Sequence, residues 1–398
     1  MAITITAAPP TDSCLNDDIW ITCSSTNSGT TNFKFVFDIK VGGTLLSRSK
    51  VFPNPADSKG YFNTAPIVRS QMTDYFEPSG SSILVASNNK NGVTYVLEVR
   101  EEVSGGISVL PDASATYRGT NFYYPEFTDL YSSGSNVSLS SVYNTQLNNY
   151  KDNWLTERDL RNIQVKFGDR FYISFLRSEG VNETGYLRTL DSAGNVVASY
   201  NAAVNMTGGF NIFNLSAAAL NAWRGSTIIT ENTFAYEFYI TGAGTSRVVR
   251  IQHYCNWHEG YNVHFLNRLG GYDTYNFALV NRKSASYERN DFRRSDWQRT
   301  SGVMQTYDAY NRYNQTRVPY SVKHTNNIKL TGDWVNAINY DWLSQLIASP
   351  NAYLEVQSMY LPLYITTSNW EQKFMEVDKM FNLEIEAEIP KTIYSQFR

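Results

Sequence analysis

The stretch Arg250–Leu279, RIQHYCNWHEGYNVHFLNRLGGYDTYNFAL, is the part of the sequence from which the fold is best predicted. Side chains of Val263–Leu266 would alternate between two directions, as they do in an extended strand. Gly270 and Gly271 follow, and glycine accepts the positive φ angles of tight hairpin turns. Aromatic residues that suit a half-buried pleated surface then recur at Tyr272, Tyr275 and Phe277. The stretch therefore predicts a central β-hairpin.

The composition of the chain is typical of a β protein. Charged residues make up only 18% of the 398 residues and aromatic residues 14%, with 28 tyrosines. Large aromatic side chains favour strands, and the abundant Asn, Ser and Thr favour turns. The chain is too long for one ordinary core. We predict a mainly β fold of tandem β-sandwich (fibronectin/Ig-like) domains, with a C-terminal β-rich domain that carries one amphipathic helix.

Charge and cysteine content exclude several classes of protein. The net charge of −3 and the pI of about 5.9 give no global basic field, so nucleic acid is an unlikely partner. Cys14, Cys23 and Cys255 are an odd number, which disfavours a disulfide scaffold. The start of the chain does not resemble a signal peptide, and no run approaches the roughly 18 apolar residues of a membrane helix. We expect synthesis in a cytoplasm and no membrane insertion.

Residues 1–105 are predicted to form the first β-sandwich. Aromatic and aliphatic residues recur at every second position of Phe33–Ile39, as in a strand that buries one face. The spacing of apolar residues in Ile67–Phe76 predicts one short helix. Residues 106–155 lack such periodicity but are rich in tyrosine, which predicts an irregular connecting segment that drapes over a neighbouring domain or subunit.

Residues 156–285 are predicted to form a second β-sandwich that includes the central hairpin. Ser192–Asn195 is a hairpin-type turn between two strand-like runs. Ser216 is placed to cap a short helix that begins directly after it.

Residues 286–398 are predicted to form an α+β assembly domain. Its helix would be capped by Asn336 and ended by Ser349-Pro350, because the residue before proline avoids helical backbone angles. Apolar residues alternate with glutamates in Phe381–Ile389, which predicts a last strand that exposes acids on one face. We expect Pro319 to interrupt the tyrosine-rich segment before the helix.

Three histidines and one cysteine near the hairpin are the candidates for a metal site: His253, Cys255, His258 and His264. Zinc accepts imidazole nitrogen and thiolate sulfur as ligands. The sequence contains no Cys-x-x-Cys pair, however, and His264 is separated from the other three residues by a turn of undefined geometry. We favour a polar, aromatic strand end without a metal, and keep His253, Cys255 and His258 as the residues to test.

Asp273 is the one carboxylate considered for catalysis. Aspartate in a turn usually accepts hydrogen bonds from its own backbone, so a structural role is favoured. No nucleophile-elbow, zinc-protease or phosphate-binding glycine motif occurs, and the acidic residues are too scattered to nominate a glycosidase pair. The sequence predicts a protein that is not an enzyme and needs no cofactor.

Arg282–Arg299 is the most basic local stretch, with arginines interleaved among aromatic residues. Such a pattern can contact nucleic acid or sugar. Glu288, Asp291 and Asp296 interrupt it, which favours cross-strand ion pairs or a subunit contact. Our interface or ligand candidates in the whole chain are Trp223, Trp257, Tyr272, Asp273, Arg293, Arg294 and Trp297.

Two blocks of the sequence resemble virion proteins of tailed bacteriophages, especially phages that infect Bacteroidetes. Phe265–Phe277, FLNRLGGYDTYNF, is similar to their L-N-x-x-G-G-x-D-x-aromatic-x-F segment. Leu330–Glu355, LTGDWVNAINYDWLSQLIASPNAYLE, and Tyr360–Lys373, YLPLYITTSNWEQK, are similar to a second block, in the same order along the chain. These motifs are structural and contain no catalytic residues.

The resemblance implies a structural component of a phage virion, in the tail, baseplate or neck. We expect a symmetric, ring-type homo-oligomer that connects tail parts or carries host-binding fibres. Its partners would be further copies of itself and other virion tail proteins, and it would be made in the cytoplasm of the bacterial host.

The alternative is a carbohydrate-binding adhesin or receptor-binding protein that contacts a host surface glycan. Exposed aromatic side chains on sandwich loops, such as Trp223 and Trp257, would stack on sugar rings. A third class, a zinc-dependent or carboxylate hydrolase, depends on the histidine cluster alone.

Overall fold

The structure is a computed structural model of the 398-residue chain. It describes residues 3–9, 12–16, 18–72, 76, 82–87, 92–120, 149–177, 183–206, 209–254, 258, 260–293, 298–300, 303–305, 317–357, 359–370 and 381–394. The chain divides into two compact units. Unit 1 is Met1–Cys255, His264–Tyr275 and Ala348–Pro350, and unit 2 is Asn256–Val263, Asn276–Ile347 and Asn351–Arg398.

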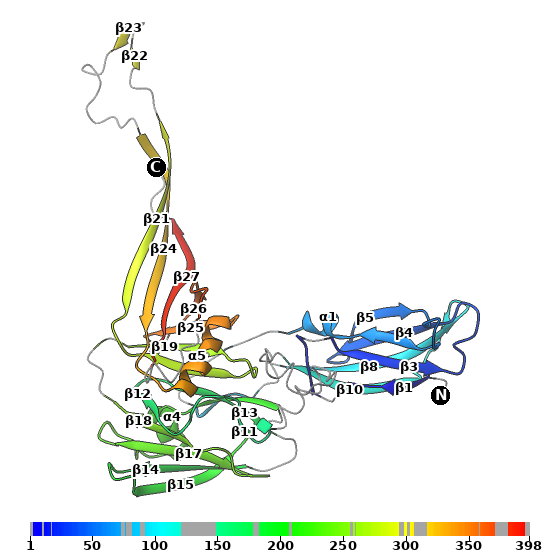
Figure 1. Cartoon of the computed structure of the whole chain (residues 1–398), viewed down its shortest axis with the longest axis horizontal. Helices are drawn as coiled ribbons and strands as arrows, with labels where there is room; N and C mark the ends of the chain where they lie inside the picture. The colour runs from blue at the N-terminus through cyan, green and yellow to red at the C-terminus, as the bar shows by residue number, and fades with distance from the viewer. Residues whose placement is uncertain are drawn as a thin grey trace. The chain divides into compact units, whose positions relative to one another are not determined.

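The fold is mainly β, with tandem β-sandwiches followed by a β-rich C-terminal part that carries an amphipathic helix, as predicted (Figure 1). In the first sandwich of unit 1, one sheet has the strand order β1-β3-β6 and the other β2-β10-β8-β4-β5, with β9 paired to β8. These strands are β1 (Ile3–Ala7), β2 (Asp12–Cys14), β3 (Trp20–Ser25), β4 (Lys34–Val41), β5 (Thr44–Val51), β6 (Gly60–Asn63), β8 (Gly92–Val103), β9 (Gly106–Ile107) and β10 (Ala113–Thr120). Phe35 and Phe37 of β4 are fully buried between the sheets, but Val36 and Asp38 on the other face are buried as well. The prediction that this strand buries only one face is therefore wrong, because Asp38 is paired with arginines inside the protein.

The first sandwich extends beyond the predicted boundary at residue 105. Strand β10 pairs with β8 from Ala113 to Thr120, so it completes the larger sheet. Its small residues Ala113 and Ala115 pack against the core but give a weak hydrophobic pattern in the sequence. The predicted short helix is α1 (Ala65–Arg69), which begins before Ile67 because proline suits the first helical turn. Residues 121–148 of the predicted connecting segment lie outside the described residues.

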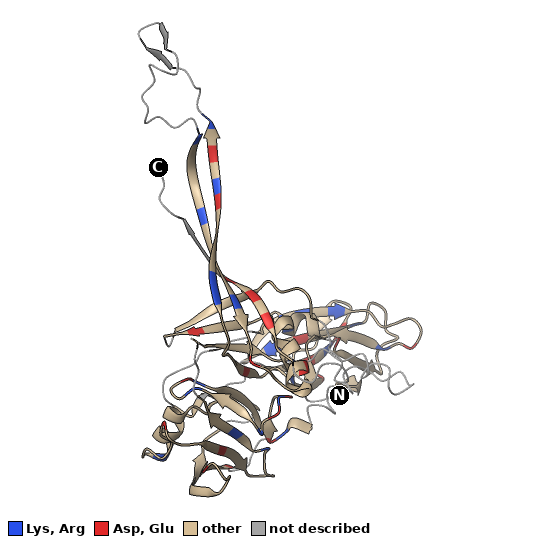
Figure 2. Ribbon diagram, turned by 60° about the vertical axis from the view of Figure 1, so that its left-hand side comes forward, with Lys and Arg blue, Asp and Glu red and all other residues tan. Residues whose placement is uncertain are grey.

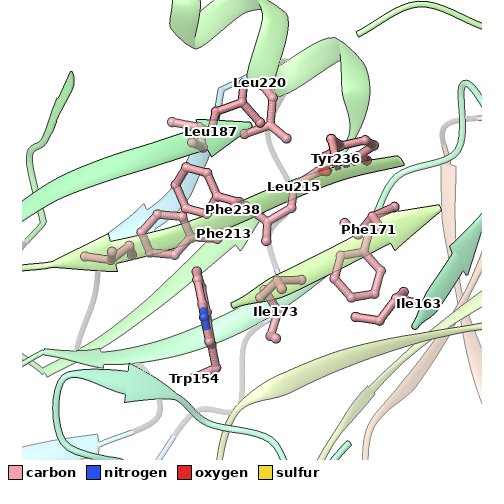
Figure 3. Packing of buried hydrophobic residues seen from close by; sticks show 14 of the residues in the cluster. Trp154, Ile163, Phe171, Ile173, Leu187, Phe213, Leu215, Leu220, Tyr236 and Phe238 are labelled. Carbon is pink, nitrogen blue, oxygen red and sulfur yellow. Dashed lines mark hydrogen bonds between the residues drawn. The ribbon is translucent and has the colours of Figure 1, made fainter. Parts of the chain in front are cut away.

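The second sandwich of unit 1 combines the sheets β11-β13-β16-β7 and β12-β18-β17-β14-β15. Its strands are β7 (Leu84–Ser87), β11 (Asn153–Trp154), β12 (Ile163–Val165), β13 (Tyr172–Arg177), β14 (Glu183–Leu190), β15 (Val196–Val204), β16 (Gly209–Asn214), β17 (Ala235–Thr241) and β18 (Val249–His253). Trp154 is fully buried and lies edge-on to Phe175 and Phe213, with ring centroids 5.1 and 5.4 Å away (Figure 3). Strand β7 precedes residue 105 yet pairs with β16. One strand from the predicted range of the first sandwich therefore belongs to a sheet of the second.

Two local predictions for the second sandwich are confirmed. The turn between β14 and β15 is closed by Asp191, whose carboxylate accepts from the backbone N–H groups of Ala193 and Asn195. Helix α4 (Ala217–Arg224) begins where expected, and the Ser216 side chain accepts from the backbone N–H of Ala219.

A seven-stranded sheet with the order β20-β19-β25-β26-β27-β24-β21 dominates the β-rich C-terminal part. Its strands are β19 (Tyr261–Leu266), β20 (Tyr272–Phe277), β21 (Arg282–Arg293), β24 (Arg317–Thr331), β25 (Ala352–Val356), β26 (Met359–Ile365) and β27 (Glu384–Tyr394); β22 (Gln298–Thr300) and β23 (Val303–Gln305) pair separately. Ile385 and Ala387 of β27 are buried while Glu384 and Glu386 are exposed, so the predicted one-faced strand is confirmed.

Helix α5 (Ala337–Ala348) has the predicted ends. The Asn336 side chain accepts from the backbone N–H of Asn339 at 2.8 Å, and the helix stops before Ser349-Pro350. Its buried face contains Trp342 and Leu346, whereas Ile338 in the first turn is 55% exposed.

The central hairpin has the predicted strands but not the predicted burial. Every residue of β19 and all but one of β20 are buried, so both faces of the hairpin are covered rather than one. The strands also belong to the seven-stranded sheet and not to a sheet of the second sandwich. A pattern of aromatic and polar residues cannot reveal the second buried face, because its polar side chains are paired inside the protein.

Candidate functional site

The turn of the central hairpin is held by one asparagine. The Asn267 amide oxygen accepts from the backbone N–H groups of Leu269 and Gly271, both at 3.0 Å, and its amide nitrogen donates to the Leu155 carbonyl at 2.7 Å. Gly270 adopts a φ of 78°. Gly271 has no positive φ, but a Cβ atom there would lie 2.8 Å from the Ser174 Cβ. Gly270 therefore allows the backbone conformation of the turn, and Gly271 allows close packing against Ser174.

Asp273 is the centre of a buried polar network in unit 1. It is 2% exposed, and its carboxylate accepts from the Thr156 hydroxyl at 2.7 Å and from the Asn267 amide at 2.9 Å. The sequence predicted bonds to its own backbone within a turn; instead Asp273 lies in β20 and binds side chains. Its location beneath the surface supports a structural role.

Arg158 is the main cation near this carboxylate. Its guanidinium donates to the Thr274 carbonyl at 2.7 Å. Burial lowers the pKa of Arg158 to about 10, an effect that the charge of Asp273 opposes. Arg158 therefore remains a buried cation at neutral pH, and Asp273 compensates its charge.

The histidines considered for a metal site make different contacts. His264 is fully buried, with Nδ1 2.9 Å from the Thr274 hydroxyl and its ring stacked on Phe76. His253 lies half-buried at the end of β18, with Nδ1 3.2 Å from the Thr233 carbonyl. Burial lowers the pKa of His253, although the Thr233 contact raises it in part. His258 is exposed, and Cys255 lies outside the described residues.

Among the residues that the structure describes, no three His, Cys, Asp or Glu side chains gather as metal ligands do. Of the described histidines, His253 lies at the end of a strand and His264 lies inside the hairpin.

The tryptophan proposed as a sugar contact in the second sandwich is not on an exposed loop. Trp223 is half-buried on α4 and packs edge-on against Tyr200 and Phe238, at centroid distances of 5.0 and 5.7 Å. Tyr272 is fully buried and its ring lies 4.8 Å from that of Phe76. Tyr272 is a core residue, and Trp223 packs against the core of the second sandwich. Trp257, Arg294 and Trp297 lie outside the described residues.

Strand β21 has the opposite property, since most of its residues are exposed, and it forms a ribbon of two long antiparallel strands with β24, most of which is half-buried (Figure 1). We use the name exposed ribbon for Arg282–Arg293 and Arg317–Lys329, which pair with each other. No residue of β21 is buried, although β21 is 12 residues long. Strand β27 pairs with β24 only as far as Lys323, so the outer part of the ribbon has two strands.

Charged residues on the exposed ribbon pair across its strands (Figure 2). Arg317 binds Asp291 through two guanidinium nitrogens, and Lys323 lies 3.7 Å from Glu288. The hydrogen bond from Arg317 lowers the pKa of Asp291, and the pKa of Arg317 is raised in return. The cross-strand ion pairs predicted for this basic stretch are therefore present. Arg293 is exposed at the end of β21, opposite Arg317.

Large aromatic side chains also lie exposed on the ribbon. Tyr287 is 56% exposed and stacks on His324 at a centroid distance of 5.3 Å. Tyr320 is 54% exposed and Phe292 43%. Fixed, exposed aromatic rings are typical of surfaces that another protein covers.

The sequence analysis did not predict the exposed ribbon, because Pro319 was expected to interrupt the segment that contains β24. Pro319 instead lies within β24 opposite Asp291, where the register shifts by one residue and Tyr320 is the extra residue. A bulge is one of the few places where a strand tolerates proline. The usable signal was the length of the polar run Arg282–Arg293, which has strand-forming residues but no apolar face.

Comparisons with known proteins give little further guidance. No protein-family model and no curated protein matches the chain. A solved structure, that of the chicken CNTN1 FN1-FN3 domains, is similar at 13% sequence identity and a TM-score of 0.18. The match covers 63% of this chain and 65%, less than two thirds, of that chain. At this level the similarity assigns neither a family nor a function.

No helix in the described part of the chain has the length and apolar character needed to cross a membrane.

Proposed function

We propose that this protein is a structural component of a phage virion, in the tail, baseplate or neck, that assembles into a symmetric ring. The observation that carries the proposal is the exposed ribbon. The resemblance of the hairpin and C-terminal blocks to phage virion proteins suggests the location, and the exposed ribbon adds a surface through which copies could assemble. Further copies and other tail proteins are the partners proposed.

A two-stranded antiparallel ribbon is marginally stable by itself in water. The outer part of the exposed ribbon, where β21 and β24 pair without β27, has this form and keeps Phe292 and Tyr320 in solvent, while Tyr287 is exposed where β27 still pairs with β24. Surface ion pairs such as Arg317–Asp291 add little stability. Packing against a neighbouring subunit would bury the aromatic rings and extend the sheet at its edge strand β21.

The buried position of Asp273 and the contacts of His253 and His264 support a role without catalysis. Each of these side chains holds segments of unit 1 together. The adhesin alternative is weaker at Trp223, because that ring is half-buried and packs edge-on against Phe238 of the core.

The test replaces residues 287–324 with Asn-Gly. Ser286 and Thr325 are partners in the ladder, so a two-residue hairpin turn can join them. We expect the full chain to form a discrete oligomer in light scattering across a concentration series, and the shortened chain to be a monomer with unchanged circular dichroism outside the lost strands.

The matched control changes two exposed apolar residues away from the ribbon. Val196 and Val197 of β15 are 52% and 70% exposed, and their replacement by Thr should leave the oligomer intact. A full chain that stays monomeric at every concentration, or a shortened chain that keeps its oligomeric mass, would contradict assembly through the exposed ribbon.

The place in the virion needs a separate experiment. Antibodies against the purified protein should label the tail region of particles of the phage that encodes it in immunoelectron microscopy. Unlabelled particles would exclude a virion component accessible at the surface, and mass spectrometry of the same particles would show whether the protein is present at all.

A further inference from the structure

The outer face of the sheet β1-β3-β6 in unit 1 carries two exposed aromatic rings. Residues of β3 and β6 alternate between the core and solvent, with Ile21 and Phe62 inside. Trp20 and Tyr61 point outward and are 55% and 38% exposed. Nothing in the proposed assembly through the ribbon uses this face.

The two rings are diagonal neighbours on the sheet. Trp20 pairs with Asn63, and Thr22 pairs with Tyr61. These two pairs are neighbours on the outer face, so Trp20 and Tyr61 lie at diagonal positions. Diagonal neighbours in an antiparallel pair lie ~7–8 Å apart. The two rings thus form one surface with Thr22 between them.

Hydrogen bonds and close packing fix this surface from below and from its rim. The Tyr61 hydroxyl donates to the carboxylate of Asp57. The Asn63 side chain accepts from the Ile19 backbone N–H at 3.0 Å and donates to Asp18 at 2.6 Å. Gly60, next to Tyr61, leaves room for the Phe35 ring, because a Cβ at this position would lie 2.6 Å from a ring carbon. Tyr61 is therefore held in place before any ligand binds, which reduces the entropy lost on binding.

The surroundings of the rings are rich in hydroxyl and carboxylate groups. Thr4 and Thr6 of β1 are exposed on this sheet, and Thr22 and Ser24 of β3 are half-buried. Asp18 and Asp57 are exposed at the rim. No large aliphatic side chain lies among these outward residues of β1, β3 and β6. A protein partner would leave these polar groups desolvated without the apolar core that protein interfaces have.

We propose that Trp20 and Tyr61 form a binding site for a saccharide. A pyranose ring has an apolar C–H face, which packs on an aromatic ring, and hydroxyl groups at its edge, which bond to carboxylates and hydroxyls. The aromatic platform, defined as Trp20, Thr22 and Tyr61, supplies the stacking surface. Asp18 and Asp57, which as carboxylates only accept hydrogen bonds, face the donor hydroxyls of the sugar. The ligand class is a neutral oligosaccharide.

The site is distinct from the sugar contacts expected from the sequence. Trp223 packs half-buried against the core of the second sandwich, whereas Trp20 lies exposed on a strand of the first. The proposal does not depend on a virion location, because a saccharide site would function on a monomer or on a ring.

The experiment uses the full chain on an array of neutral hexose and N-acetylhexosamine oligosaccharides, followed by calorimetric titration with the best binder. We expect Trp20→Ala to weaken binding by about tenfold or more, as is usual for an aromatic anchor. Trp20→Phe keeps a stacking ring and should retain most of the affinity. Tyr61→Ala should weaken binding in the same direction, and thermal melting confirms that each variant is folded.

The matched control is Trp334→Ala. Trp334 is 54% exposed, nearly the same as Trp20, but lies in unit 2. Its removal should leave the affinity unchanged. A wild-type chain that binds no oligosaccharide on the array overturns the proposal, and so does binding that both Trp20→Ala and Tyr61→Ala leave unchanged.

Discussion

The central hairpin and the exposed ribbon are two strand pairs of one sheet, close together in the sequence but opposite in burial. All residues of β19 and all but one of β20 are buried, whereas none of β21 is. The hairpin is short, with six residues in each strand, and the ribbon strands have 12 and 15. A folded protomer therefore gains stability from the hairpin, while the ribbon offers surface to other molecules.

One aspartate in each pair makes the contrast concrete. Asp273 is 2% exposed and is bound by Thr156 and Asn267 near the buried Arg158. Asp291 binds Arg317, whose side chain is 74% exposed. Water can replace the partner of Asp291 but cannot reach that of Asp273, so loss of the two carboxylates should have different consequences.

Asp273→Asn is expected to have the largest effect on folding. Removal of the charge leaves the buried Arg158 with less compensation, and loss of the partner of a buried charge can cost about 3–5 kcal/mol. Urea unfolding followed by circular dichroism measures the loss in free energy of unfolding. Asp291→Asn is the control on the exposed ribbon and should not change the unfolding midpoint measurably. Equal losses for the two variants would mean that the hairpin network has no special role.

Gly271→Ala tests whether the hairpin is held by close packing. The added Cβ would lie 2.8 Å from the Ser174 Cβ and 3.0 Å from the Leu155 carbonyl oxygen. Such overpacking costs about 1–3 kcal/mol, which thermal and urea unfolding both detect. Gly244→Ala is the control in unit 1, because its Cβ would meet no atom within 4 Å. A tolerated Gly271→Ala would show that β20 can move away from β13.

The dependence of stability on pH should also differ between an ion pair in the core and an ion pair at the surface. Burial raises the pKa of Asp38 on β4, but hydrogen bonds and charges of Arg48 and Arg100 outweigh burial, so its pKa is lowered from 3.8. A lowered pKa means that the stability from Asp38 is fully present above pH 3.8 and is lost as the pH falls through the folded value below it.

The measurement is urea unfolding of wild type and Asp38→Asn between pH 7 and pH 2.5. We expect the variant to be less stable at pH 7 and the difference to shrink at the acid end. For Asp291→Asn, in which an ion pair with the exposed Arg317 is lost, the two curves should differ little throughout. A difference for Asp38→Asn that stays constant with pH would contradict the ion-pair explanation.

Local backbone signals predicted the ends of elements well. Ser216 and Asn336 begin helices, Gly270 provides the turn of the hairpin, and Pro350 follows the end of α5. Each of these depends on a few neighbouring residues, so the sequence contains the cause.

Long-range partners could not be predicted in the same way. Asp273 meets Thr156 across more than a hundred residues, and β7 pairs with β16 in another sandwich. An aspartate after two glycines has the same appearance in a sequence whether it faces water or a buried arginine. Trp20 and Trp223 likewise differ only in what the rest of the fold places over them.

Tyr287→Ser is expected to have the smallest effect on folding and yet a clear effect on assembly. The ring is 56% exposed and contacts His324, also on the ribbon, so its loss should leave the urea midpoint of the protomer unchanged. If the ribbon packs against a neighbour, loss of an aromatic anchor should weaken association about tenfold, measured by light scattering over a dilution series.

Tyr200→Ser is the control, because that ring packs on Trp223 beside the second core and should lower stability without a selective effect on association. A loss of protomer stability in Tyr287→Ser as large as in Gly271→Ala would mean that the ribbon is covered within the protomer, and the contrast with the central hairpin would fail.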